Sequence, residues 1–278
     1  MNVMSKASQA AVAPPQPRNY ASVNWTGLWT LYLREVRRFW KVWTQTLAAP
    51  VMTALLYMMI FVVAVGGARR MMEGVPFGEF VGPGLVMMSV LNNAFANASS
   101  SLIQAKIMGT APDFLTPPLS PLELTLGFGL GAATRGVVVG FVAAAAVWPF
   151  SHFAHLDIAN LWAIVFFSVG ASLIMGFVGV LTGLWSEKFD QLAAVTNFIV
   201  MPMTFLSGTF YLIDRLPPFF QTVSRYNPFF YLIDGFRFGF IGQHEGSLLA
   251  GVITTIVLTL VLGLACFEAF RRGWRLKT

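Results

Sequence analysis

The sequence predicts an all-α polytopic membrane protein, and two observations carry that prediction. Of the 278 residues, 56% are hydrophobic and 11% are charged, whereas soluble domains carry about 25% charged residues. Several uninterrupted apolar stretches of about 20 residues are long enough to cross a bilayer core as helices. A membrane β-barrel would instead need short segments of alternating hydrophobicity, and these stretches do not alternate.

The N-terminal region is expected to contain a tail followed by an interface helix. Residues 1–22 are rich in Ala, Pro and Ser and lack the apolar core of a signal peptide, so we expect a disordered cytoplasmic tail. In residues 24–43, aromatic and aliphatic residues recur at steps of three and four, while bases occupy the other side. This pattern predicts an amphipathic helix in the membrane interface, with its bases toward anionic lipid. Its charged residues include Arg34, Glu35, Arg37 and Arg38.

Six membrane spans are predicted in residues 23–278, which we expect to form one transmembrane domain. The predicted spans cover residues 46–65, 80–103, 122–148, 158–185, 192–211 and 247–267. An even number of spans puts both termini on the same side of the membrane. Most Lys and Arg residues, above all those near the two termini, then fall in segments on that side. The positive-inside rule therefore places both termini in the cytoplasm.

The composition argues against several other classes of protein. The pI of about 9.8 is explained by this loop charge rather than by nucleic-acid binding. Cys266 is the single cysteine, so neither an intrachain disulfide nor a thiol metal site is expected. His152 and His155 share a short loop without a Cys or a third His, and we predict no metal site there. The sequence contains no GxxxxGK(S/T), HExxH or GxSxG motif, so we expect neither P-loop ATP binding nor catalysis of these kinds.

The segment between the fifth and sixth spans, residues 211–245, fits neither a span nor a free loop. It is too polar and too rich in proline to cross the bilayer, and too aromatic to lie free in water. A re-entrant helical hairpin satisfies both facts, because irregular backbone is tolerated at membrane depth where protein surrounds it. Asn227 and Pro228 are expected to start its second helix as N-cap and first helical residue. Asp234 and Arg237 would share a helix face and could pair, either in the hairpin or on an exposed periplasmic helix.

A stripe of polar residues runs down the second predicted span. Its members are spaced three or four residues apart, so they share one helix face; they are Ser89, Asn93, Asn97, Ser100 and Gln104. Amide side chains are costly in lipid, and the stripe is therefore expected to face protein or water. Two interpretations stay open, a wall of a transport pathway and interhelical hydrogen bonding. A subunit interface would satisfy both.

Arg135 lies about midway along the third predicted span. An intramembrane arginine is costly and usually faces the interior of the helix bundle. We expect it to meet either an anionic substrate or a structural partner such as a carboxylate of the protein.

A long, proline-rich loop at residues 105–127 is cytoplasmic by the charge argument. Its prolines surround a short apolar segment that contains Asp113, Phe114 and Leu115. Such a loop is typical either of a surface that a partner binds or of a plain surface loop. The short, charged connection at residues 186–191 could supply a second, smaller contact.

Three stretches together resemble the permease subunits of ABC-2 type transporters. LREVRRFWKVWTQTLAAPVMTALLYMMIF is similar to the interface helix and first span of that family, and DFLTPPLSPLEL to its coupling-loop segment. MPMTFLSGTFYLIDRLPPFFQTVSRYNPFFYLIDGFRFGFIG is similar to its late signature. The resemblance covers almost the whole chain after the tail, and the combination is specific although each stretch alone is not.

This resemblance implies a function and a set of partners. Members of the family are homodimers or heterodimers of six-span subunits, and for this chain we expect the inner membrane of a bacterium. They bind two separate ATPase subunits, which carry ATP and Mg²⁺, and they export amphipathic or bulky cargo of drug, lipid or glycan type. We therefore expect a permease subunit without a cofactor of its own, most simply a homodimer. The alternative is a channel or secondary transporter that works without an ATPase, but no inverted repeat and no carboxylate deep in a span is visible.

The resemblance also assigns roles to residues. Contacts with the ATPase are expected from Ile107, Met108, Asp113, Phe114, Leu115, Glu187, Lys188 and Asp190. The outer re-entrant gate would contain Asn227, Pro228, Asp234 and Arg237. Ser89, Asn93, Asn97, Ser100 and Arg135 would belong to the pathway or to the dimer interface. Replacing Phe114 or Leu115 by Asp is expected to uncouple ATP hydrolysis from transport.

Overall fold

The computed structural model describes residues 23–64, 71–72, 74–150 and 158–275. The predicted N-terminal tail, and His152 and His155, lie outside the described residues. Within these ranges the chain is almost entirely helical, as the all-α prediction requires. A small exception was not predicted: the strands β1 (Met71–Met72) and β2 (Val75–Pro76) pair antiparallel.

The helices, in chain order, are α1 (Trp25–Lys41), η1 (Thr44–Ala48), α2 (Ala49–Met58), η2 (Met59–Ala64), α3 (Phe77–Ile107), α4 (Pro112–Leu115), α5 (Pro121–Val147), η4 (Trp148–Phe150), α6 (Leu161–Trp185), α7 (Phe189–Val195), η6 (Thr196–Val200), α8 (Met201–Phe205), η7 (Ile213–Arg215), α9 (Pro218–Tyr226), α10 (Pro228–Ile241) and α11 (Leu248–Arg271). Of these, η1, η2 and η6 are π-helical turns within longer helical stretches.

Four helical stretches among the described residues are long and apolar enough to cross a membrane. They are Thr44–Phe61, Pro121–Val147, Leu161–Trp185 and Leu248–Arg271. The first, third, fourth and sixth predicted spans are thereby confirmed as helices of membrane-spanning length and composition.

The second and fifth predicted spans take other forms. α3 is one continuous helix of 31 residues, roughly 46 Å long at 1.5 Å per residue, and its polar stripe makes it less apolar than the others. In the fifth region, α7, η6 and α8 follow one another and end at Phe205. The prediction of a helix up to residue 211 is wrong, because Leu206 leaves the helical conformation and Gly208 turns the chain with a φ of 72°.

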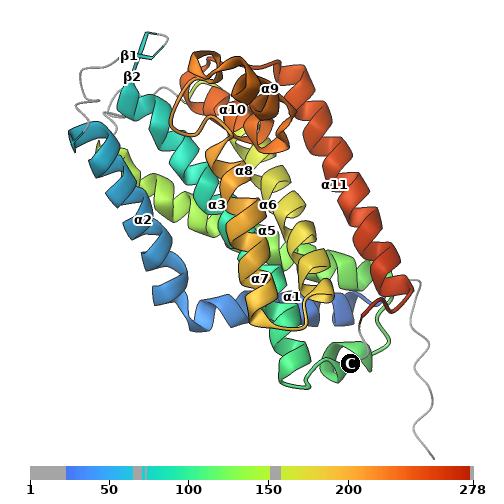
Figure 1. The fold of residues 1–278 in the computed structure, drawn as a ribbon. Coiled ribbons are helices and arrows are strands. Elements are labelled where there is room, and N and C mark those ends of the chain that lie inside the picture. The colour runs from blue at the N-terminus through green and yellow to red at the C-terminus, as the bar shows by residue number, and fades with distance from the viewer. Residues whose placement is uncertain (1–22, 65–70, 73, 151–157, 276–278) are drawn as a thin grey trace, which may run out of the picture.

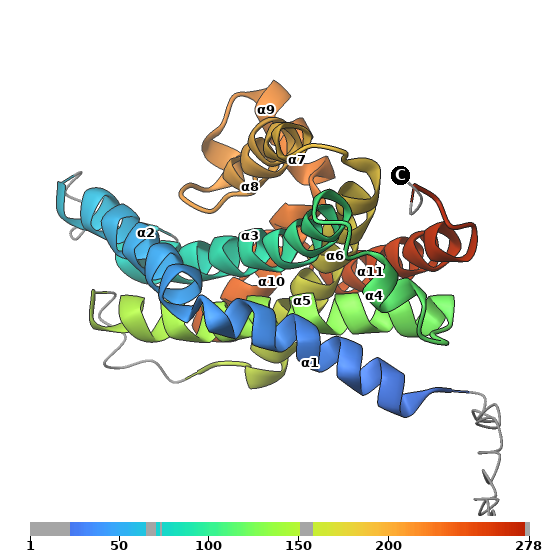
Figure 2. The same cartoon turned by 90° about the horizontal axis from the view of Figure 1, so that it is seen from below.

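The long helices form a bundle that α1 crosses at one end. α3, α5 and α6 pack in the centre, with α11 on one side and α2 on another (Figure 1). α1 lies across the lower end of α5 at a large angle to the bundle (Figures 1 and 2). α4 also lies at this end, whereas α9 and α10 lie at the opposite end (Figure 1). The charge argument predicts that the end with α1 and α4 faces the cytoplasm, and we call it the cytoplasmic end and the opposite one the outer end.

Small residues let α6 approach α3 closely. A Cβ added to Gly179 would lie 2.6 Å from the carbonyl oxygen of Phe95, and one added to Gly183 would lie 2.9 Å from that of Ser99. These separations are too short for a real side chain, so both positions require glycine. The tight contact holds α3 deep in the protein, and it leaves the opposite side of α3 to line the site.

Candidate functional site

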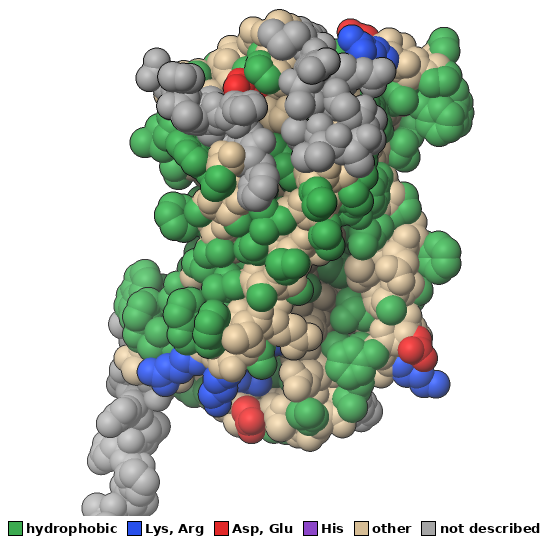
Figure 3. Space-filling model, turned by 90° about the vertical axis from the view of Figure 1, so that its left-hand side faces the viewer, with side chains coloured by type: hydrophobic (Ala, Val, Ile, Leu, Met, Phe, Trp, Pro, Cys, Tyr) green, Lys and Arg blue, Asp and Glu red, His purple; other side chains and the backbone are tan. Residues whose placement is uncertain are grey.

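A groove of about 690 Å³ runs along α3 on the side facing away from α6. Its walls come from η1 and α2 on one side and from α7, η6 and α8 on the other, with α1 and α5 contributing at the base. Figure 2 shows α2 and the α7–α8 segment standing apart on either side of α3. A view onto the side of α2 shows no charged side chains of the described residues over the middle of the molecule, whereas Lys and Arg lie mainly at the lower edge, with a further group at the upper edge (Figure 3).

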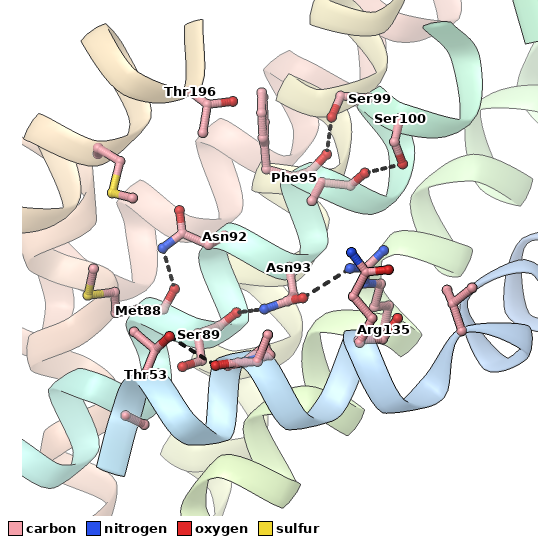
Figure 4. Close-up of a pocket in the computed structure, with 18 of the residues that line it drawn as sticks. Thr53, Met88, Ser89, Asn92, Asn93, Phe95, Ser99, Ser100, Arg135 and Thr196 are labelled. Atoms are coloured by element: carbon pink, nitrogen blue, oxygen red, sulfur yellow. Dashed lines mark hydrogen bonds between the residues drawn. The ribbon is translucent and has the colours of Figure 1, made fainter. Parts of the chain in front are cut away.

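The polar stripe of α3 lines this groove. Ser89, Asn93, Ser100 and Gln104 all contribute to its wall. The Asn93 side chain donates to the carbonyl oxygen of Ser89 at 3.0 Å, and the Ser100 hydroxyl bonds the carbonyl oxygen of Ala96. These hydroxyl and amide groups therefore make part of their hydrogen bonds within their own helix and present the remainder to the groove (Figure 4).

Several lining residues were not singled out from the sequence. Asn92, Thr53 and Thr196 face the same space from α3, α2 and η6 (Figure 4). Asn92 lies three residues after Ser89, a spacing that could have included it in the stripe. The sequence carries no local signal that brings Thr53 and Thr196 opposite α3, because that depends on how the helices pack.

Arg135 points into the base of the groove from α5. Its Nη2 donates to Oδ1 of Asn93 at 3.1 Å (Figure 4). The expected structural partner is thus an amide oxygen and not a carboxylate. The Nε atom of Arg135 is buried and has no hydrogen-bond partner among the described residues.

Arg38 enters the groove from α1 and ties that helix to α3. Its Nη1 donates to the Ser100 hydroxyl at 3.1 Å, and its Nη2 donates to Oδ1 of Asn97 at 3.0 Å. The Nη2 atom also lies 3.3 Å from the carboxylate of Glu35, which is fully buried and accepts from Ser101 at 2.7 Å. Asn97 is itself fully buried in this network, so it contacts the base of the groove only through Arg38.

The prediction that the bases of the interface helix face anionic lipid is wrong for Arg38. Glu35 and Arg38 turn into the bundle because they share a face with Leu31, which is buried against α5. Arg34 also lies partly over this face, with its guanidinium 5.4 Å from the ring centre of Phe114. Of the four residues, Arg37 is the one that stays exposed.

The cytoplasmic loop folds around an aromatic anchor. Phe114 in α4 is 3% exposed and packs edge-on against Phe128 at 5.4 Å. By contrast Ile107, Met108 and Leu115 are 52%, 66% and 38% exposed. The expectation that Phe114 faces a partner is therefore wrong, since its ring packs beneath α4, whereas the other three apolar side chains are exposed at this end of the molecule.

The second cytoplasmic connection lies beside the end of α3. Nζ of Lys106 donates to the carbonyl oxygens of Leu184 and Ser186, at the end of α6. Nη1 of Arg275 donates to the carbonyl oxygen of Trp185 at 2.9 Å. Burial, and then the nearby positive charge of Arg275, lower the pKa of Lys106. The exposed residues Glu187, Lys188 and Asp190 follow directly, so Lys106 brings the two predicted contact segments together.

The outer hairpin begins as predicted. Asn227 caps α10 by accepting from the backbone N–H of Phe229 at 3.0 Å, and Pro228 is the first helical residue. The other amide atom of Asn227 donates to the carbonyl oxygen of Met203 at 2.6 Å, which ties the hairpin to α8.

Asp234 and Arg237, whose spacing would let them pair, each bind segments outside α10. Asp234 accepts from the backbone N–H groups of Glu245 and Gly246, both at 2.9 Å. Arg237 donates to the carbonyl oxygens of Phe80 and Gly208 at 3.2 and 2.7 Å, and lies 3.7 Å from the ring centre of Phe80. Both are buried, and they join the hairpin to distant segments.

A carboxylate at this outer end has an unusual environment. Oε1 of Glu245 accepts from the backbone N–H groups of Ile213 and Asp214. Burial raises the pKa of Glu245 to about 7, against the opposing effect of the hydrogen bond from Ile213. The group is poised to change its charge near neutral pH.

Comparisons with known proteins indicate one family of membrane transport proteins. A family model described as ABC-2 type transporter matches residues 26–241. Inner membrane transport permease YadH of Escherichia coli K12 is 33% identical over 255 residues, which cover 91% of this chain and 98% of YadH. Nodulation protein J of Rhizobium leguminosarum bv. trifolii is 26% identical over 87% of this chain and 93% of its own length, and that of Rhizobium meliloti is 25% identical over 86% and 92%.

Proposed function

The chain belongs to the ABC-2 type transporter family as an inner-membrane transport permease, and from this premise we propose that it is the membrane subunit of an ATP-driven exporter. The groove along α3 would form half of the translocation pathway. The apolar patch at the cytoplasmic end would receive the ATPase, and the α9–α10 hairpin would close the outer end.

We propose six spans, with both termini in the cytoplasm. α3 is long enough to cross a bilayer, and its burial against α5 and α6 explains how it can be less apolar than a lipid-facing span. The segment from α7 to α8 covers Phe189 to Phe205, about 26 Å at 1.5 Å per residue. This is close to the roughly 30 Å of a bilayer core, and the hairpin would complete the crossing from the outer side as a re-entrant element.

The groove is the observation that carries the proposal. It holds hydroxyl and amide groups at membrane depth, and its open side would otherwise face lipid. Exposing Asn92 and Ser89 to hydrocarbon would be costly. A second copy of the chain that covers this side would remove that cost and would turn two grooves into one enclosed pathway, which supports a homodimer.

The cytoplasmic end supports the assignment of an ATPase partner. Ile107, Met108 and Leu115 form an apolar patch on a surface that should face water, and exposed apolar patches mark interaction sites. Asp113, Glu187 and Asp190 add exposed carboxylates around it. Two ATPase subunits, each with its own ATP and Mg²⁺, would bind there and move α4 and the end of α3.

Cargo of amphipathic or bulky type, whether drug, lipid or glycan, fits a groove of this size with mixed lining. For export the pathway must have two states that bind the cargo with different affinity, and the ATPase supplies the free energy that drives their exchange.

Co-purification from the native membrane in mild detergent tests this function. We expect a P-loop ATPase to accompany the tagged chain in stoichiometric amount, identified by mass spectrometry. Leu115→Asp should abolish the association while the chain still inserts as a dimer. A wild-type chain that purifies without an ATPase, even after cross-linking before solubilisation, would favour a channel or secondary transporter.

A further inference from the structure

We propose that the base of the groove binds the anionic headgroup of an amphipathic cargo, such as a lipid-borne phosphate, through Arg38 and Arg135. This inference rests on the proposed function, since it names the class of cargo that the groove would carry. It follows from the charge balance, the free hydrogen-bond donors and the polarity of the lining.

The charged side chains that line the groove are all positive. Two arginines line it, and none of its lining residues is Asp or Glu. The carboxylate of Glu35 neutralises the charge of Arg38, from a position outside the groove lining; its Oε2 lies 3.3 Å from Nη2 of Arg38. Arg135 has the neutral amide oxygen of Asn93 as its hydrogen-bond acceptor. The groove therefore has an excess of one positive charge.

Both guanidinium groups keep donors that the protein does not satisfy. The Nε atoms of Arg38 and Arg135 are buried and have no hydrogen-bond partner among the described residues. A buried, partly bonded cation is costly. The Nη1 group of Arg135 makes no hydrogen bond among the described residues and is not buried, so an anion at the groove base would supply its acceptor. Guanidinium groups suit this role because their planar set of donors matches phosphate and carboxylate oxygens.

The polarity of the lining changes along the groove. At the cytoplasmic end the wall includes Gln45, Ser100 and Gln104, which can hydrogen-bond a headgroup. Toward the outer end it includes Tyr57, Leu85 and Met201, which offer an apolar surface. A molecule with an anionic head and an apolar tail would match both ends when it enters from the cytoplasmic leaflet.

The same headgroup chemistry could come from a free anion, and the lining favours the lipid-borne source. A free phosphate would leave the apolar end of the groove unused. The test therefore compares dioleoylphosphatidylglycerol, dioleoylphosphatidylcholine and inorganic phosphate.

The experiment uses the full-length chain with its ATPase, delipidated in detergent, and counts bound lipid by native mass spectrometry. We expect wild type to retain phosphatidylglycerol over phosphatidylcholine by about tenfold, which is about 1.4 kcal/mol, because the choline cation cancels the charge of the phosphate that the arginines would bind. Arg135→Gln should lose most of this preference, whereas Arg135→Lys should keep part of it. Inorganic phosphate should compete weakly.

Arg271→Gln is the matched control, since Arg271 is an exposed arginine of α11 that pairs with Glu268 and lies outside the groove lining. It should bind lipid like the wild type. Equal retention of phosphatidylglycerol by wild type and Arg135→Gln would overturn the inference, as would full competition by inorganic phosphate. Melting temperatures of the lipid-free variants would show whether each still folds.

The two proposals fail in different ways. If the ATPase co-purifies but the lipid preference is absent, the anionic cargo is wrong and the exporter function stands. If no ATPase co-purifies, the exporter function is wrong whatever lipid is retained.

Discussion

Arg135 and Arg237 are two arginines in one membrane protein, and their surroundings differ in a way that separates function from structure. Arg237 binds two backbone carbonyl oxygens and the face of Phe80. Arg135 binds one amide oxygen and keeps a buried Nε without a partner in the described chain. Arg237 is one of the contacts that hold the outer hairpin in place, whereas Arg135 lies on the wall of an open groove. Whether the N–H groups of an arginine all have acceptors within the protein, more than how deeply the residue is buried, distinguishes a structural arginine from one that can bind a ligand.

Replacing Arg237 should have the largest effect on folding. Arg237→Ala leaves the carbonyl oxygens of Phe80 and Gly208 buried without a donor and removes the ring contact, so we expect a loss of about 4 kcal/mol of stability. Thermal unfolding in detergent would measure it. Arg225→Ala is the control, because Arg225 forms an exposed ion pair with Asp214 and such pairs contribute at most about 1 kcal/mol. If the two variants had equal melting temperatures, Arg237 would contribute no more to stability than an exposed arginine does.

The same contrast between buried and exposed residues can be tested in the cytoplasmic loop. Phe114→Ala should cost about 3 kcal/mol of stability, because it empties the space between α4 and Phe128. Leu115→Asp should leave the melting temperature nearly unchanged and should abolish ATPase association. If Leu115→Asp unfolds the protein, the exposed patch is part of its core and not a docking surface.

A smaller effect is expected for the fold when Arg135 is replaced. Arg135→Gln removes one hydrogen bond and a costly buried cation, and these changes oppose each other. We expect the free energy of unfolding, measured by thermal unfolding, to change by less than about 1 kcal/mol. A loss as large as that of Arg237→Ala would mean that Arg135 is structural, and the comparison between the two would fail.

The smallest effect concerns pH at the outer end. The raised pKa of Glu245, about 7, means that the folded protein holds this proton more tightly than the unfolded chain does. Stability from this group is present at low pH and is lost as the pH rises from the ordinary carboxyl range through about 7. Glu245→Gln can still accept the hydrogen bond from Ile213 and should remove this dependence. Melting curves at pH 5 and pH 8 should differ less for the variant than for wild type.

The periodicity of the sequence predicted much of the fold but not the packing partners. Helices were predicted where the apolar runs are long, and Asn227 with Pro228 marked the start of α10, because these signals are local. The inward position of Arg38 and the burial of Phe114 were misjudged because they depend on α3 and on Phe128 of α5, which the local sequence pattern does not reveal. Asp234 and Arg237 have the spacing of an ion pair, but that spacing does not reveal that Arg237 also binds the backbone of Phe80, which is 157 residues away. The polar stripe of α3 was visible, but its position opposite Thr53 and Thr196 depends on tertiary structure.

The central claim is that the groove along α3 is a transport pathway, and that its accessibility to water changes when the ATPase binds ATP. A direct test places a single cysteine at Asn92 in a Cys266→Ala background and measures labelling by a water-soluble maleimide in inside-out vesicles. A cysteine at Leu260, exposed on α11, serves as the lipid-facing control. The account predicts that Asn92→Cys reacts in the resting state, that trapping the ATPase with ATP and vanadate changes its rate several-fold, and that Leu260→Cys stays unreactive. If Asn92→Cys is as unreactive as Leu260→Cys in both states, the groove faces lipid or packed protein and is not the pathway.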